Sequence, residues 1–162
     1  MDSADSLTMP CGQKTANKRG TDMTTEVLPP LPLPNELTAA FWDGANQGQL
    51  VIQRCNACGH FQHAPEPICA NCLSFDLGYA AVSGKGSVYT FCIPTQAFHP
   101  WFEDKLPFVL AVVELDEQPG LKMITNIVET NPDDVKVGDR VEVTFTPLGE
   151  GFTLPVFRPA AQ

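Results

Sequence analysis

The chain has 162 residues, of which 43% are hydrophobic, and its formal net charge is -9. This length suffices for one domain, or for one domain and a small module. The chain has no apolar run as long as a membrane span and no apolar segment behind a basic start, so we expect no membrane association and a cytoplasmic location. The surplus of acidic residues argues against nucleic acid as a partner, because a phosphate backbone needs a basic surface.

Residues 1–34 predict a disordered tail that ends in a proline-rich arm. Up to about residue 28 the tail is polar, of mixed charge and without periodicity. Met9 and Met23 are alternative starts, so the sequence leaves open whether residues 1–22 are translated. The arm, LPPLPLP from Leu28 to Pro34, predicts an extended conformation. It is either a surface linker or a strap across a partner.

A helix is expected over residues 35–49. Asn35 is a favourable N-cap residue after Pro34, and Gly48 is expected to end the helix. Apolar residues follow at helical spacing: Leu37, Ala40, Phe41 and Ala45, with Trp42 beside them. The run LVIQRC then predicts a short strand that leads into the first cysteine pair.

Four of the six cysteines form two Cys-x-x-Cys pairs, Cys55, Cys58, Cys69 and Cys72. Each pair makes a tight turn that aims two thiolates at one point, and two such turns complete a tetrahedron. The spacing predicts a Zn(Cys)₄ ribbon over residues 50–77, with iron as the alternative because it accepts the same sulfur tetrahedron. Four sulfurs leave no open position for water or substrate, so the metal is predicted to be structural.

The histidines near the cysteines, His60 and His63, are expected to be surface or neighbouring side chains that do not bind the metal, because four cysteines are available.

From residue 84 onward the pattern is typical of strands. Five runs combine β-branched and aromatic residues, with turn residues between them. The runs are Gly86 to Ile93, Phe108 to Leu115, Leu121 to Val128, Arg140 to Pro147 and Phe152 to Pro159. Five short strands with one small helical insert fit a Greek-key barrel of the OB type over residues 84–159. The fold class is therefore mainly β: a helical arm, a zinc ribbon and a five-stranded barrel.

The longest insertion between strands, Ile93 to Phe108, is rich in aromatic residues. It carries Phe98, His99, Trp101 and Phe102. These rings either cap the barrel or pack on the predicted helix, or they form a binding loop. His99 has no partner at a spacing typical of catalysis, and no nucleophile elbow or metalloprotease motif occurs. We therefore predict no catalytic residue.

Several segments together resemble one known family across residues 35–159. They are FWDGANQGQLVIQRCNACGHFQHAPEPICANC, SGKGSVYTF, PFVLAVVEL, VGDRVEVTF and LPVFRP. The chain resembles the acyl-CoA-associated family, formerly a domain of unknown function, in which a rubredoxin-like zinc ribbon precedes an OB-fold.

This resemblance implies an accessory role. Family members look like small non-catalytic subunits or fused domains that bind thiolase-superfamily enzymes, namely thiolases, thiolase-like aldolases or acyltransferases, and others pair with hydratase-like subunits. The resemblance implies a hetero-oligomer that makes or breaks C–C bonds in acyl-CoA substrates. The barrel and its 94–107 loop would meet the partner and the CoA thioester. Lys85, Lys105 and Arg54 are candidates to contact the CoA phosphates.

Two other functions remain as alternatives. Zinc ribbons and OB-folds elsewhere bind single-stranded nucleic acid. A free-standing module that binds CoA or an acyl group is the third hypothesis. The sequence does not specify the acyl substrate, the partner, the stoichiometry or the direction of the reaction.

Overall fold

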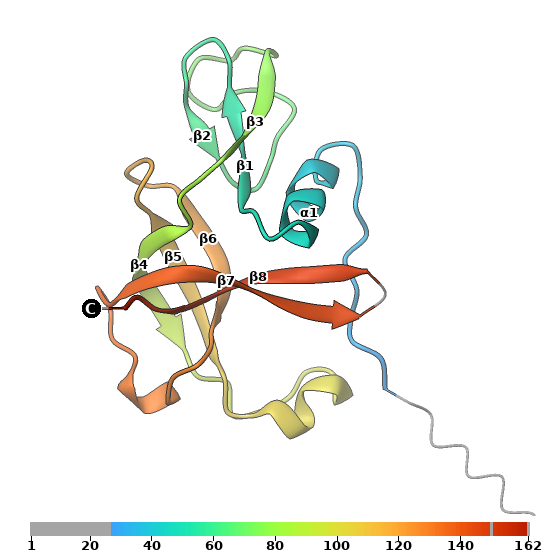
Figure 1. The fold of residues 1–162 in the computed structure, drawn as a ribbon, viewed down its shortest axis with the longest axis vertical. Helices are drawn as coiled ribbons and strands as arrows, with labels where there is room; N and C mark the ends of the chain where they lie inside the picture. Colours follow the sequence, from blue (N-terminus) through green and yellow to red (C-terminus); the bar gives the residue numbers. More distant parts are fainter. Residues whose placement is uncertain (1–26, 150, 162) are drawn as a thin grey trace, which may run out of the picture.

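The computed structural model describes residues 27–149 and 151–161. The predictions made for residues 1–26 lie outside this range. Figure 1 shows a small sheet above a barrel, with one helix beside the small sheet and a long hairpin that passes below that helix. In the described part of the chain, no helix has the length and apolar character needed to cross a bilayer.

Helix α1 spans Ala39–Asn46, so it is shorter than the predicted helix. Asn35 nevertheless caps the turn that precedes it, because its Oδ1 accepts the backbone N–H groups of Leu37 and Thr38 at 3.0 Å each. The regular helix begins only after Thr38. At the other end Gly48 adopts φ of 72°, which is the left-handed conformation expected of a residue that stops a helix.

The small sheet has three antiparallel strands in the order β2–β1–β3. The strands are β1 (Val51–Cys55), β2 (Phe61–Gln62) and β3 (Leu77–Ala81). Both Cys-x-x-Cys turns lie in the connections of this sheet, so the sheet is the scaffold of the ribbon. The hydroxyl of Tyr79 on β3 donates to the carbonyl of Leu37, which ties the sheet to the segment before α1.

The barrel is closed, with the strand order β4–β5–β6–β8–β7. The strands are β4 (Lys85–Cys92), β5 (Val109–Leu115), β6 (Lys122–Ile127), β7 (Arg140–Gly149) and β8 (Phe152–Pro159). Two short 3-10 helices lie between them, η1 (Pro100–Lys105) and η2 (Pro132–Asp134). The five predicted strands are confirmed, and the structure is mainly β with an OB-type barrel.

Alternating apolar residues explain why these strands form a barrel. Along β5, Val109, Ala111, Val113 and Leu115 are buried while the residues between them are not. The barrel core continues into the ribbon, because Leu50 and Ile52 belong to the same buried cluster as Val113 and Phe157. Ribbon and barrel therefore share one core.

The predicted turn into the barrel, SGKGS, contains a glycine that no other residue replaces without strain. Gly84 has φ of +70°, and a Cβ placed on it would lie 2.2 Å from Cγ1 of Val143 on β7. The Gly84 carbonyl also accepts the backbone N–H of Val143 at 2.7 Å. The backbone at Gly84 therefore packs directly against β7, and this contact fixes where β4 begins.

Candidate metal centre and apolar cavity

The four cysteines of the ribbon converge on one point. Their Sγ atoms all lie within 4.8 Å of one another. The Sγ atoms of Cys55 and Cys72 are 3.6 Å apart, and those of Cys58 and Cys69 are 3.7 Å apart. A tetrahedron with metal–sulfur distances of about 2.3 Å has sulfur–sulfur edges of about 3.8 Å. The cluster is therefore positioned to bind a metal ion.

The two Cys-x-x-Cys turns have the same backbone geometry. In the first, the N–H of Gly59 donates to the carbonyl of Cys55 at 2.9 Å; in the second, the N–H of Leu73 donates to the carbonyl of Cys69 at 3.0 Å. Both turns place a residue at positive φ directly after the second cysteine, with 78° at Gly59 and 60° at Leu73. The second turn thus holds a leucine in a conformation that normally favours glycine.

The protein surroundings of the four sulfurs favour at least one thiolate even without a bound cation. The Asn71 side chain, whose Nδ2 donates to Sγ of Cys58 at 3.6 Å, lowers the pKa of Cys58 to about 6. The Ser74 backbone N–H lowers the pKa of Cys72, but the neighbouring Cys58 and burial outweigh it and raise that pKa to about 12. Thiolates this close repel one another unless a cation lies between them, and the donor set therefore fits a metal ion.

Two buried glutamines hold the loop between the cysteine pairs. Oε1 of Gln53 accepts from Nε2 of Gln62 at 2.7 Å and from the Glu66 backbone N–H at 2.9 Å, while its Nε2 donates to the Glu66 carbonyl at 3.0 Å. Gln62 in turn bonds the backbone of Ile68 and Ala70. Gln53 lies in a segment that carries the family resemblance, but a single glutamine in a strand gives no signal that it forms these hydrogen bonds.

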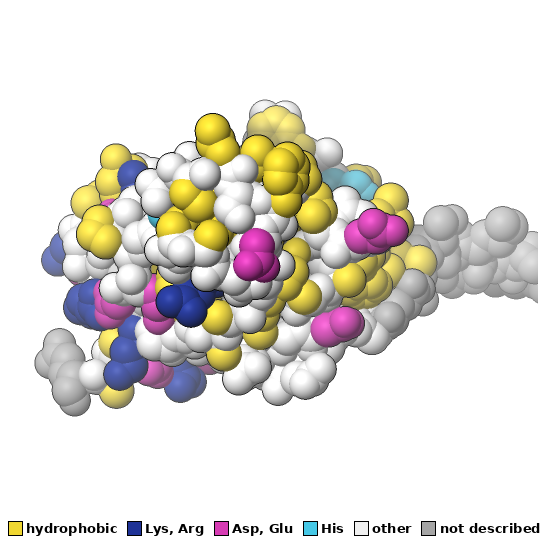
Figure 2. Space-filling model, turned by 90° about the horizontal axis from the view of Figure 1, so that it is seen from above, with side chains coloured by type: hydrophobic (Ala, Val, Ile, Leu, Met, Phe, Trp, Pro, Cys, Tyr) yellow, Lys and Arg dark blue, Asp and Glu magenta, His cyan; other side chains and the backbone are white. Residues whose placement is uncertain are grey.

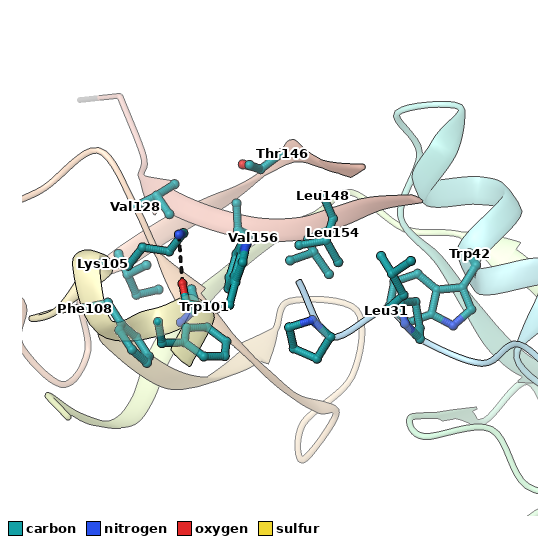
Figure 3. A pocket seen from close by; sticks show the side chains of 15 residues that line it. Leu31, Trp42, Trp101, Lys105, Phe108, Val128, Thr146, Leu148, Leu154 and Val156 are labelled. Atoms are coloured by element: carbon teal, nitrogen blue, oxygen red, sulfur yellow. Dashed lines mark hydrogen bonds between the residues drawn. The ribbon is translucent and has the colours of Figure 1, made fainter. Parts of the chain in front are cut away.

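A second candidate site is an apolar cavity of about 460 Å³ on the barrel side of the molecule. Its walls come from four places: the proline arm, α1, the aromatic loop and the strands β6 to β8. Figure 3 shows Leu31 beside Trp42 at one end and Trp101 near Phe108 at the other. Leu154 of β8 lies between the two ends.

The aromatic loop forms one end of this cavity. The Trp101 and Phe102 rings meet edge to face with centroids 4.9 Å apart, and the Phe102 and Phe108 centroids are 5.6 Å apart. Lys105 Nζ lies 4.0 Å above the Trp101 ring and donates to the Trp101 carbonyl at 2.9 Å (Figure 3). Nζ also lies 3.0 Å from a carboxylate oxygen of Asp104.

A smaller cavity of about 280 Å³ adjoins the first across the seam between β6 and β8. Trp42, Asn126, Leu154 and Val156 line both. The parallel pair Ile127–Phe157 joins the two strands beyond this point. These four residues therefore form a wall that the two cavities share.

The predicted contact residues divide into three groups. Trp101, Phe102 and Lys105 line the larger cavity. Phe98 and His99 belong to the same loop but do not line it: Phe98 is 92% exposed, and His99 Nδ1 accepts the Trp101 backbone N–H at 3.2 Å.

Lys85 and Arg54 are apart from this loop. Lys85 begins β4, and Arg54 Nε donates to the Gly59 carbonyl in the ribbon at 3.3 Å. The loop aromatics line the end of the cavity opposite Trp42, and the proline arm and β8 contribute walls that the sequence did not predict. The alternation in FTLPVFRP indicates strand β8 but not which face meets a ligand.

Comparison with known proteins identifies both parts of the chain. The model of the ChsH2 rubredoxin-like zinc ribbon domain matches residues 42–78, and that of the ChsH2 C-terminal OB-fold domain matches residues 79–146. A probable enoyl-CoA hydratase alpha subunit of Thermomonospora curvata is 39% identical over 140 residues, which cover 86% of this chain and 43% of the relative. The chain thus spans less than half of that subunit.

Two further relatives are matched over most of their length. A DUF35 domain-containing scaffold protein of Methanocaldococcus jannaschii is 34% identical over 102 residues, which are 62% of this chain and 70% of the scaffold protein. The solved Ltp2-ChsH2(DUF35) aldolase contains a chain that is 40% identical, with a TM-score of 0.73, and the match covers 81% of this chain and 100% of that one. The chain therefore belongs to the ChsH2-type DUF35 family, in which a rubredoxin-like zinc ribbon is followed by an OB-fold domain.

Proposed function

We propose that the chain is a non-catalytic accessory subunit that binds a thiolase-superfamily partner and helps to close the partner's acyl-CoA site. The names of two relatives, a hydratase alpha subunit and an aldolase, support a role in acyl-CoA complexes. The observation that carries the proposal is the aromatic loop. It exposes Phe98 almost completely while Trp101 and Phe102 line an apolar cavity beside it. Exposed aromatics on a rigid barrel are typical of protein interfaces.

The metal in this proposal is a structural zinc ion. Its ligands are Cys55, Cys58, Cys69 and Cys72, and their four sulfurs complete a tetrahedron without room for a substrate. Iron would fit the same sulfurs, so elemental analysis of the purified protein and its visible absorption distinguish the two.

The surroundings of the histidines support a non-catalytic role. His99 lies in the aromatic loop, and its Nδ1 is occupied because it accepts the Trp101 backbone N–H as the cap of η1. His63 packs against Phe41 with ring centroids 5.4 Å apart, and burial lowers its pKa. Neither histidine forms a hydrogen bond to a hydroxyl or thiol nucleophile among the hydrogen bonds of the described residues.

The net charge of -9 and the face seen in Figure 2 support a protein or acyl partner over a nucleic acid. In Figure 2, which views the molecule from the ribbon end, Lys and Arg side chains gather at one edge among Asp and Glu, and hydrophobic side chains spread over much of the rest. A nucleic-acid groove needs a continuous basic track. A free-standing CoA module would need cations for the phosphates, and Lys105 is the one cation among the described residues that line the larger cavity.

The test is co-expression with a thiolase-superfamily protein encoded beside this chain. The two proteins should co-purify, and the partner's turnover of acyl-CoA should rise when the complex forms. Phe98→Ser should weaken co-purification, whereas Val137→Ser, which removes another exposed apolar side chain (65%) outside the loop, should not. A partner that is soluble, fully active and never retained by this chain would refute the proposal.

A further inference from the structure

We infer that the larger cavity is a binding site for the apolar acyl chain of an acyl-CoA, and that it excludes the CoA nucleotide. This inference rests on the proposed function for the origin of the ligand. The site itself is argued from the cavity, the seam between β6 and β8, and the proline arm.

The cavity has the size and chemistry of a small-molecule site. Its volume of about 460 Å³ falls within the range of about 300–1,000 Å³ that ligand pockets occupy. The lining is nearly all aliphatic and aromatic, and the long β7–β8 hairpin supplies Leu148 and Leu154 to it (Figure 3). An extended chain would fit from the aromatic loop toward Trp42 (Figure 3).

The single cation of the cavity does not offer a phosphate site. Lys105 Nζ lies 3.0 Å from the Asp104 carboxylate, and it also contacts the Trp101 carbonyl and ring. A phosphate would have to displace Asp104 and would face that carboxylate at short range. The nucleotide end of the ligand is therefore expected to lie outside, on the partner.

The strand edge along the cavity does not suit a peptide. A peptide that added a strand to β8 would need alternating backbone donors and acceptors. Pro155 has no N–H, and its carbonyl already accepts from Thr125 Oγ1 at 3.0 Å. An acyl chain needs no such bonds, so this edge favours an aliphatic ligand over a polypeptide.

The proline arm makes the hollow a pocket. Pro30, Leu31 and Pro32 line it, at the end of the cavity where Trp42 also lies (Figure 3). Proline-rich segments are extended before they bind anything, so little conformational entropy is lost when the arm covers the ligand.

The two tryptophans of the chain, Trp42 and Trp101, both line the larger cavity, so indole fluorescence reports on this site, and Trp42 also reports on the smaller cavity. The experiment titrates the full chain, without a partner, with 10-bromodecanoate, whose bromine quenches indole emission on contact. Quenching should be saturable and reversed by excess decanoate. Decanoyl-CoA should compete as decanoate does, and free CoA should not.

Single-tryptophan variants locate the ligand. In Trp42→Phe the quencher reports on Trp101, and in Trp101→Phe it reports on Trp42; at least one must be quenched saturably. Leu154→Glu places a charge in the cavity and should weaken binding by about tenfold or more. Val137→Glu, the same kind of change at an exposed position away from the cavity, should leave binding unchanged.

The outcomes are decisive for each proposal separately. Quenching that is not saturable, or that decanoate does not reverse, overturns the acyl site even if Leu154→Glu fails to fold. Competition by free CoA overturns the exclusion of the nucleotide. A chain that binds decanoate but never retains a partner contradicts the accessory function and leaves the acyl site standing.

Discussion

Replacing Gln53 with Met should loosen the ribbon without touching a cysteine. Gln53 is 3% exposed, and its amide makes three hydrogen bonds, to Gln62 and to both backbone groups of Glu66. Met keeps the unbranched shape and fills the same space, so the change removes the hydrogen bonds and little packing.

The magnitude follows from the groups left without partners. Gln62 Nε2 keeps the Ile68 carbonyl at 3.2 Å, so the loss falls on the N–H and carbonyl of Glu66. Each part-buried backbone group left unpaired costs about 1–3 kcal/mol, and partial access to water favours the lower end. We expect the free energy of unfolding to fall by about 2–3 kcal/mol.

Denaturant unfolding of the metal-loaded protein, followed by far-UV circular dichroism, measures this change. Release of the metal to a chelator should also be faster, because the loop between the cysteine pairs loses its anchor. Gln96→Met is the matched control, since Gln96 lies exposed in the aromatic loop. A Gln53→Met protein within about 0.5 kcal/mol of the parent would refute the account.

Three further predictions concern the metal, the barrel turn and pH. Cys69→Ser should release the metal by elemental analysis and reduce complex activity only through lost assembly; a folded, assembled variant without turnover would contradict a structural metal. Gly84→Ala should lower the free energy of unfolding by about 2–5 kcal/mol, because backbone strain at φ of +70° adds to the clash with Val143. Gly120→Ala is the control: its φ is +81° with nothing within 4 Å, so it should lower the free energy of unfolding by about 1–2 kcal/mol. Equal losses of stability in the two variants would exclude the clash. Burial lowers the pKa of His63 from 6.5, so below that pH the unfolded chain takes up a proton that the folded chain does not. Stability should fall from pH 7 to 5, and His63→Gln should flatten that slope; parallel slopes would contradict it.

The sequence predicts the parts of the fold that follow from local pattern. Cysteine spacing indicates the metal cluster, and the alternation along runs such as FVLAVVEL indicates the strands and which residues are buried. The sequence predicts that the helix starts at Asn35, but the N-cap of α1 is Thr38, and Asn35 caps only the turn before it.

The cavity could not be predicted, because barrel closure brings its walls together from distant segments. Nothing in the sequence indicates that Leu31 and Trp42 line one cavity, or that Trp101 and Leu154 line it too. The sequence also does not show which cations lie close together, so charge alone placed Lys85 and Arg54 with Lys105 as candidate contacts to the CoA phosphates. The structure separates them, since Arg54 lies in the ribbon with its guanidinium 5.5 Å from the Phe61 ring centroid.

Ribbon and barrel are held together by more than their common core. Gln118, in the turn between β5 and β6, bonds both backbone groups of Phe61 on β2, at 2.9 Å from its Oε1 and at 3.1 Å from its Nε2. The Gln118 side chain therefore forms the two hydrogen bonds with β2 that a fourth strand would form at this edge of the ribbon sheet. A hybrid protein in which the ribbon is exchanged at residues 82–84 would lose the match between the new ribbon and Gln118. The angle between its ribbon and its barrel would then no longer be fixed. In this chain, by contrast, a partner that binds only the ribbon also fixes the orientation of the barrel.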